Sequence, residues 1–469
     1  GAETFYTYDP QRRRLQNLRE EEMFEVPEWA ANKVVYQIFP SRFAATEPVD
    51  KELWYKAPIT PMDDLHGNLR GIIEHMDDIQ NLGIDVLYMT PIFQSNSCHK
   101  YDTTDYYQID PSFGTTEDLK ELVQKAHERG MKVVLDAVYN HTGREFFAFA
   151  DILENGEKSK YRDWYFIDGF PLKSEWGEIP NFKCFGYYGG MPKLNLKNPE
   201  VEKYITDVAC YWIKECDIDG WRLDVGDEIS HFFWKNFRKA VKAVKKDMLI
   251  IGEIWHYAGD FLEGDEWDTV MNYPFYLNLI DLLADEKINV SQFIQNLGYL
   301  KGRLNKQCYP LMWNLIDSHD TARFLHLCND NKKKQHLAAA FQLLLPGMPM
   351  IYYGDEYAMP GANDPDCRRG MYWDEEYQDK EMYEWYKRLI QVRKSHACIV
   401  EGELAGSVTE DEEGTIVLIR KNGEETIAMI FNCSSSAKKF NEYTQKYNLL
   451  TENTFDGNVE GFDAAVIVL

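Results

Sequence analysis

The chain has 469 residues, of which 44% are hydrophobic, enough for one large domain and one or two smaller ones. Asp and Glu number 77 against 51 Lys and Arg, and this net charge of −26 argues against nucleic acid or anionic lipid as partners. No apolar stretch is long enough to cross a bilayer, and the opening GAETFYTYDPQRRR has no apolar signal core. Nine cysteines without paired spacing indicate free thiols and a cytoplasmic protein, and give no zinc signature.

From residue 34 onward, short apolar strands alternate with amphipathic helices. Near-continuous apolar runs are typical of strands buried on both faces, as in a parallel sheet. The alternation leaves a closed (β/α)8 TIM barrel and an open doubly wound sheet as alternatives, and eight units over this length favour the barrel. The predicted strands are 34–39, 84–91, 132–138, 219–224, 248–253, 269–272, 312–317 and 348–354.

Two helices are predicted with defined ends. Residues 116–129 place their apolar side chains on one face, and Gly130 follows as a C-terminal stop. The helix over 199–216 begins with Pro199 after Asn198, which is a favourable N-cap residue. Both helices fit the outer layer of an α/β fold.

Two segments depart from the alternation. Residues 142–197 are rich in Gly and aromatic residues and too long for a βα loop, which predicts a small excursion domain after the third strand. After about residue 400, β-rich runs separated by KNGEE predict a C-terminal antiparallel β-sandwich domain. The predicted organisation is an N-terminal extension over 1–30, a barrel domain over 31–398 and the C-terminal β domain over 399–469.

Acidic residues end several of the predicted strands, namely Asp136, Asp224, Glu253 and Asp320. The C-terminal strand ends of a parallel barrel form its active site. A single acid there can be a helix cap, but several together repel one another, and a fold tolerates that mainly for function. Clustered carboxylates without a metal fit glycoside hydrolysis, in which one carboxylate attacks the anomeric carbon and another protonates the leaving oxygen.

The neighbours of these acids fit the same chemistry. Arg222 shares a strand face with Asp224 and can hold it ionised. Glu253 follows LIIG and precedes Ile and Trp, an apolar setting that suits a protonated acid. Flat faces for sugar rings are available on Trp255, Tyr101, Phe275 and Trp176, with core packing as the alternative for each.

Five motifs carry a resemblance to a known family. Four resemble, in order and spacing, the motif regions of the α-amylase family, glycoside hydrolase family 13: DAVYNH (136–141), GWRLDVGDE (220–228), GEIW (252–255) and NLIDSHD (314–320). The fifth, MPKLN (191–195), is similar to a motif of its neopullulanase, cyclomaltodextrinase and maltogenic amylase subgroup. HKYDTTDYYQIDPSFG and GANDPDCRR also match that subgroup, and the resemblance runs from about residue 24 to the C-terminus.

The resemblance implies roles for individual residues. Asp224 is then the nucleophile, Glu253 the general acid/base, and Asp320 the group that grips substrate hydroxyls at the cleavage subsite. Further substrate contacts are implied for Tyr101, His141, Arg222 and His319 in that subsite, Asp364 and Arg368 for the sugars further out, and Glu228 towards the leaving group. Trp255 is a further candidate for substrate binding.

The implied activity is retaining hydrolysis of α-1,4-glucosidic bonds, with α-1,6 bonds as a second class, in maltooligosaccharides, cyclodextrins, pullulan or starch. A glycosyl transferase or sugar isomerase on the same scaffold, an ordinary endo-acting α-amylase, and a binding protein without chemistry stay open as alternatives. The intact set Asp224, Glu253 and Asp320 argues against the last of these.

No cofactor is expected. The segment 43–54, FAATEPVDKELW, lacks most of the oxygen ligands that a calcium site needs. Asn140 matches a calcium ligand of other amylases, but a hydrogen bond that holds its loop is an equally good role. The expected partner is an α-glucan oligosaccharide, and the chain is expected to be a monomer or a homodimer.

Overall fold

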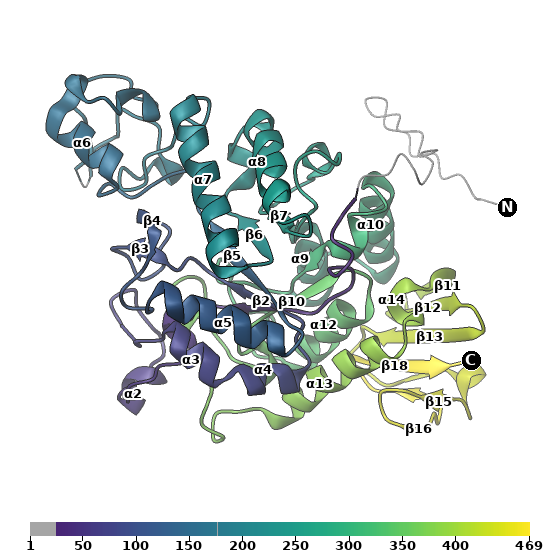
Figure 1. Ribbon diagram of the computed structural model, residues 1–469. Helices are drawn as coiled ribbons and strands as arrows, with labels where there is room; N and C mark the ends of the chain where they lie inside the picture. The colour runs from purple at the N-terminus through teal and green to yellow at the C-terminus, as the bar shows by residue number, and fades with distance from the viewer. Residues whose placement is uncertain (1–24, 176) are drawn as a thin grey trace.

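The computed structural model describes residues 25–175 and 177–469 (Figure 1). Most of the predicted N-terminal extension over 1–30, and Trp176, therefore lie outside the described residues. Among the helices of the described part, none is both long and apolar enough to span a bilayer.

Eight parallel strands close into a barrel at the centre of the molecule (Figure 1). The strands are β1 Val35–Ile38, β2 Val86–Met89, β5 Lys132–Ala137, β6 Gly220–Leu223, β7 Leu249–Gly252, β8 Thr269–Asn272, β9 Trp313–Asn314 and β10 Met348–Tyr352. Around the barrel they follow the order β1-β10-β9-β8-β7-β6-β5-β2. Each corresponds to a predicted strand, so the barrel is confirmed and the open sheet is excluded.

The strand register brings the candidate acids side by side. Leu223 of β6 pairs with Ala137 of β5 on one side and with Gly252 of β7 on the other. The backbone N–H of Asp224 then donates to Ala137 O at 3.1 Å, and that of Glu253 to Leu223 O at 3.0 Å. Asp224 and Glu253 therefore leave the same rim of the barrel from neighbouring strands.

Helices surround the barrel. The helices α5 Thr116–Glu128 and α7 Pro199–Cys216 confirm both predictions, including the Asn198 side-chain cap on α7. The others are α1 Pro40–Phe43, α2 Lys51–Trp54, α3 Leu69–Glu74, α4 Met76–Leu82, α8 His231–Val244, α9 Tyr273–Leu279, α10 Val290–Arg303, α11 Phe324–Leu327, α12 Lys332–Leu344, α13 Lys380–Ser395 and α14 Cys398–Glu401.

Residues 142–197 leave the barrel between β5 and α7 and form the arm at the upper left of Figure 1. Their main helix is α6 Phe147–Asn155, and irregular loops with a few short 3-10 turns make up most of the rest that the structure describes. An isolated bridge between His141 and Lys193 fastens the arm to the end of β5. The arm lies beside the hairpin of β3 Phe93–Ser95 and β4 Thr103–Ile109.

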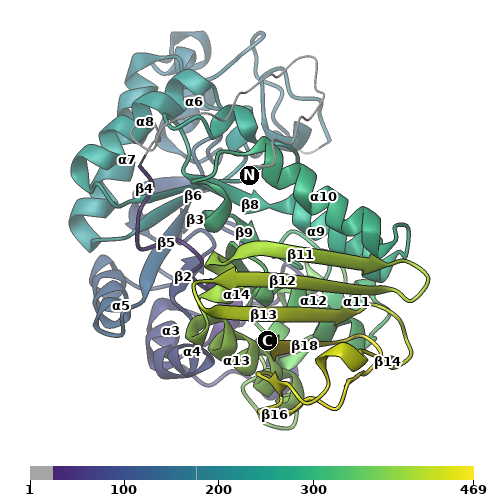
Figure 2. The same ribbon diagram turned by 90° about the vertical axis from the view of Figure 1, so that its right-hand side faces the viewer.

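The C-terminal part is an antiparallel six-stranded sheet in the order β11-β12-β13-β18-β15-β16, seen face-on in Figure 2. One face packs on the barrel domain, where Phe431 stacks on Phe341 of α12 with ring centroids 4.3 Å apart. On the other face a two-stranded ribbon, β14–β17, supplies a small second layer. The strands are β11 Glu403–Glu410, β12 Thr415–Asn422, β13 Glu425–Asn432, β14 Lys438–Lys439, β15 Tyr447–Asn448, β16 Asn453–Thr454, β17 Asn458–Val459 and β18 Asp463–Val468.

Candidate active site

Arg222 of β6 lies fully buried among four carboxylates. Its Nη1 donates to Asp136 Oδ1 at 3.0 Å and to Asp224 Oδ1 at 2.9 Å. Its Nη2 lies 3.0 Å from Glu253 Oε2 and 3.9 Å from Asp320 Oδ2. One guanidinium thus gathers the acids that end β5, β6 and β7 and the acid of the loop after β9.

Asp136, Asp224 and Glu253 are buried around Arg222, whose single positive charge cannot balance three ionised carboxylates. Burial raises the pKa of Asp224, and the neighbouring Glu253 carboxylate raises it further. Burial also raises the pKa of Asp320, and that of Asp136 to about 6. Because adjacent carboxylates resist joint ionisation, the contact of Asp224 with Glu253 favours a state in which only one member of the pair is ionised. Cleavage with retention of configuration needs that state of a carboxyl pair, one member ionised and the other protonated.

The surroundings of Glu253 are polar, and the expectation of an apolar setting is wrong. Its Oε2 accepts the Val225 N–H at 2.9 Å, and its Oε1 accepts the indole N–H of Trp255 at 3.2 Å. Val225 has φ of +47°, a left-handed conformation that β-branched residues rarely adopt. The strained turn after Asp224 therefore aims a backbone donor at Glu253.

Tyr101 and His319 continue the network. Their rings are parallel within 4° with centroids 5.5 Å apart. The Tyr101 hydroxyl donates to Asp136 Oδ2 at 2.9 Å and lies 2.7 Å from His319 Nε2, while the Gln37 amide lies 2.7 Å from His319 Nδ1. Burial lowers the pKa of His319 well below its usual range, so the imidazole is neutral. With Gln37 donating to Nδ1, the ring proton sits on Nε2, which is 3.2 Å from Asp320 Oδ1.

His141 connects the barrel to the arm. Its Nε2 lies 3.0 Å from the Tyr101 carbonyl oxygen, and its ring stacks on Phe185 of the arm at 5.2 Å. Burial lowers the pKa of His141 to about 4, which leaves it neutral at physiological pH. The arm is therefore seated directly against the candidate site.

Arg368 and Asp364, from the loop after β10, approach the cluster beside Asp320. Arg368 Nε donates to the His319 carbonyl at 2.9 Å, and its Nη2 lies 3.5 Å from Asp320 Oδ1. Its Nη1 lies 2.8 Å from Asp364 Oδ1. The side chains of Asp320 and Asp364 are 30% and 51% exposed, so both carboxylates can reach a ligand.

Glu228 and Trp255 are exposed beside Glu253 and the turn after Asp224. The Glu228 carboxylate lies 3.9 Å from Lys193 Nζ. Trp255 is 40% exposed and stacks on Tyr273 at 3.8 Å, which leaves a fixed ring available to a sugar. Phe275 is buried in the core, so its suggested role as a sugar platform is wrong.

Three polar residues of the site were not predicted. The Lys193 ammonium donates to Asn140 Oδ1 and, at 2.9 Å, to the Glu228 carbonyl. Tyr88 and Gln37 hydrogen-bond the acid and histidine network from inside the barrel. For Lys193, the sequence feature that could have identified it is its place in the MPKLN motif. For Tyr88 and Gln37, that feature is a polar side-chain atom within an otherwise apolar strand.

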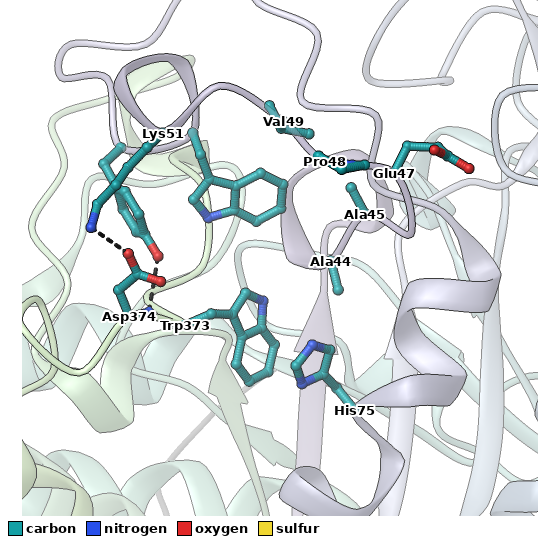
Figure 3. A pocket seen from close by; sticks show the side chains of 11 residues that line it. Ala44, Ala45, Glu47, Pro48, Val49, Lys51, His75, Trp373 and Asp374 are labelled. Carbon is teal, nitrogen blue, oxygen red and sulfur yellow. Dashed lines mark hydrogen bonds and ion pairs between the residues drawn. The ribbon is translucent and has the colours of Figure 1, made fainter.

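Neither position considered for calcium has a fitting ligand set. Segment 43–54 lines a hollow of about 400 Å³, and the Asp374 carboxylate there pairs with the Lys51 ammonium at 2.6 Å (Figure 3). Asn140 Oδ1 is already bonded to the Lys193 ammonium. Across the described residues, no group of three or more His, Cys, Asp or Glu side chains is arranged to hold a metal ion.

Comparisons with known proteins agree with this geometry. The alpha amylase catalytic domain matches residues 37–379. A cyclomaltodextrinase of Geobacillus thermopakistaniensis (strain MAS1) is 47% identical over 89% of this chain and 71% of its own, and neopullulanase 2 of Thermoactinomyces vulgaris is 43% identical over 88% and 71%. A solved cyclomaltodextrinase structure superposes with a TM-score of 0.90 at 39% identity, covering 95% of this chain and 79% of that one. The chain is thus a glycoside hydrolase that belongs to the α-amylase family.

Proposed function

We propose that this protein hydrolyses α-1,4-glucosidic bonds in short and cyclic α-glucans with retention of configuration, and accepts α-1,6 bonds as a second class. The observation that carries the proposal is the placement of Asp224 and Glu253 on paired strand ends, both within 3.0 Å of Arg222. Neighbouring strands lie about 4.8 Å apart, which suits the separation of about 5 Å that a retaining pair requires.

In the proposed mechanism, Asp224 attacks the anomeric carbon as a carboxylate while Glu253 donates its proton to the leaving oxygen. Glu253 then takes a proton from water, and that water releases the sugar from Asp224. Arg222 stabilises the ionised member of the pair in each step. Asp320 is the group proposed to hold ring hydroxyls, because its carboxylate stays exposed beside this pair.

The preference for small and cyclic substrates is supported by the names of the relatives, cyclomaltodextrinase and neopullulanase 2. It also agrees with the side chains that stand around the acid pair. Phe185 of the arm stacks over His141, and the exposed Trp255 and Glu228 stand beside Glu253.

We further propose that the activity needs no bound calcium. The support is chemical, because the Lys193 ammonium group already donates a hydrogen bond to the side-chain oxygen of Asn140. A divalent cation there would meet a like charge.

The test is a product analysis after incubation with β-cyclodextrin, pullulan, soluble starch and sucrose at equal glucose equivalents. We expect the highest rate on β-cyclodextrin, with maltose as a main product, and slower cleavage of pullulan. A rate on starch well above that on β-cyclodextrin would indicate an ordinary α-amylase instead. Isomerised sucrose without hydrolysis would indicate the isomerase alternative.

A further inference from the structure

A second group of buried charges lies behind the active site. Asp317 follows β9, Asp355 begins the 3-10 turn after β10, and both are 1% exposed, as is Arg323. Arg323 Nη1 donates to Asp355 Oδ1 at 3.0 Å and to the Tyr353 carbonyl at 2.6 Å. The carboxyl groups of Asp317 and Asp355 lie close enough to share a hydrogen bond once one of them is protonated. Asp317 Oδ1 and Asp355 Oδ2 are both buried, and no donor among the described residues reaches either of them.

A hydrogen bond between two carboxyl groups requires a proton on one of them. With one shared proton, the pair carries a single negative charge, which the single positive charge of Arg323 balances. Without it, two adjacent carboxylates would share one cation inside the protein, where unbalanced charge is costly. Burial raises the pKa of Asp317 and of Asp355, which agrees with a proton held there at neutral pH.

Asp317 also closes the loop that carries part of the active site. Its Oδ2 accepts the backbone N–H of Phe324 at 2.8 Å. The carboxyl group therefore joins the two ends of segment 318–323, which contains His319 and Asp320. Its other oxygen is left to face Asp355.

Arg323 and Arg368 complete the connection to the loop after β10. Arg323 Nε donates to the Cys367 carbonyl at 3.2 Å, next to Arg368, which in turn donates to the His319 carbonyl at 2.9 Å. The two loops that flank Asp320 are therefore joined at their buried base and again at the site.

We propose that Asp317 and Asp355, joined by one shared proton, are positioning residues that fix the loop of Asp320 against the loop of Arg368. Neither carboxyl group is expected to touch substrate, since both are buried behind the loop. The proposal deepens the proposed function, because it depends on a substrate role for Asp320.

The first test compares Asp355→Asn and Asp355→Ala in kcat and KM on maltotriose, well below the melting temperature. The amide of Asp355→Asn can donate to Asp317 while its oxygen still accepts from Arg323, so we expect kcat within about threefold of the parent. Asp355→Ala leaves the loop base unpaired, and we expect kcat to fall about tenfold to a hundredfold with a smaller change in KM.

The matched control is Asp219→Ala. Asp219 is equally buried and ion-paired, to Lys245 at 3.0 Å, but it precedes β6 at the opposite end of the barrel. We expect this control to lose stability and keep kcat. Equal kcat in Asp355→Ala and Asp219→Ala would overturn the positioning role, as would equal losses in both Asp355 variants. Asp355→Leu, which keeps the branching at Cγ without the oxygens and leaves no cavity, replaces the alanine variant if that one does not fold.

The second test follows the melting temperature from pH 5 to pH 9 in the parent and in Asp355→Asn. The pKa of Asp355 in the folded protein lies above its value in the unfolded chain. The shared proton therefore contributes its full stabilisation below the unfolded-state pKa, and that contribution is lost as the pH rises through the folded-state pKa. The variant lacks this titration, so its melting temperature should rise relative to the parent as pH increases. The other groups facing the pair are present in both proteins, namely Arg323, Glu356, Tyr36 and Tyr386.

Parallel melting profiles in the two proteins would overturn the shared proton. If the parent fails to cleave maltotriose, the proposed function fails, but the melting profiles still decide whether the pair shares a proton.

Discussion

At the scale of single residues, the chemistry depends on one guanidinium group that contacts two acids through different nitrogen atoms. Arg222 presents Nη1 to Asp224 and Nη2 to Glu253, so it stabilises whichever carboxylate is ionised. The Val225 N–H adds a second donor to Glu253 from a strained turn. The acid/base residue is therefore positioned by the turn that follows the nucleophile.

Replacing Glu253 by Gln should harm natural substrates far more than activated ones. We expect kcat on maltotriose to fall by about 10³, since the glucosyl leaving group needs a proton. Maltosyl fluoride needs little protonation, so the rate of its first step should fall by less than about tenfold. Steady-state and burst measurements on both substrates provide the comparison. An equal loss on both would mean that another residue donates the proton.

Replacing Lys193 by Met should destabilise the protein. Asn140 Oδ1 and the Glu228 carbonyl would lose their shared donor, at a cost of about 1 to 3 kcal/mol in the free energy of unfolding. Urea unfolding measures this loss. Lys203→Met serves as the control, because that ammonium is 75% exposed and should contribute little. Equal stability of the two variants would argue against the role given to Lys193.

At the scale of elements, the sheet over β11–β18 is fastened to the barrel by ring stacking. Phe431 of β13 and Phe341 of α12 are both fully buried, with planes inclined by 10°. Phe431→Ala should cost about 3 to 5 kcal/mol in unfolding free energy and keep a single transition. Val408→Ala, on an exposed position of β11, is the control. Two separated transitions would show that the C-terminal sheet unfolds independently.

The elements were predictable where a local pattern determines them. Continuous apolar runs predicted all eight barrel strands, and Asn198 followed by Pro199 predicted the start of α7. The acids at strand ends were predictable because parallel strands bring their C-terminal ends to one rim. The strand register then decides which of those acids are neighbours.

Features that depend on contacts between distant segments were not predictable. Val225 shows no sequence sign of a left-handed turn, and its bond to Glu253 joins residues 28 positions apart. Lys193 reaches Asn140 from 53 positions away, across the whole arm. Phe275 has the core-packing role that was the alternative for it, because exposure, and not residue type, separates a sugar platform from a core side chain.

At the scale of the whole molecule, the charge of −26 and the positions of two ammonium groups bear on metal dependence. An acidic surface attracts cations weakly everywhere, but the two places considered for calcium already contain Lys51 and Lys193. Dialysis against EDTA should therefore leave kcat/KM on maltotriose within about twofold of its starting value. A larger loss that calcium restores and magnesium does not would reveal a metal site.

The central claim is that Asp224 and Glu253 act as a retaining pair. The most direct measurement is peptide mass spectrometry of Glu253→Gln after reaction with maltosyl fluoride. Without an efficient general base, the second step is slow, so a covalent intermediate should accumulate. We predict a maltosyl ester on the peptide that contains Asp224, and on that carboxylate. Turnover of the fluoride with no labelled peptide, or a label on Asp136 or Asp320 instead, would contradict the account.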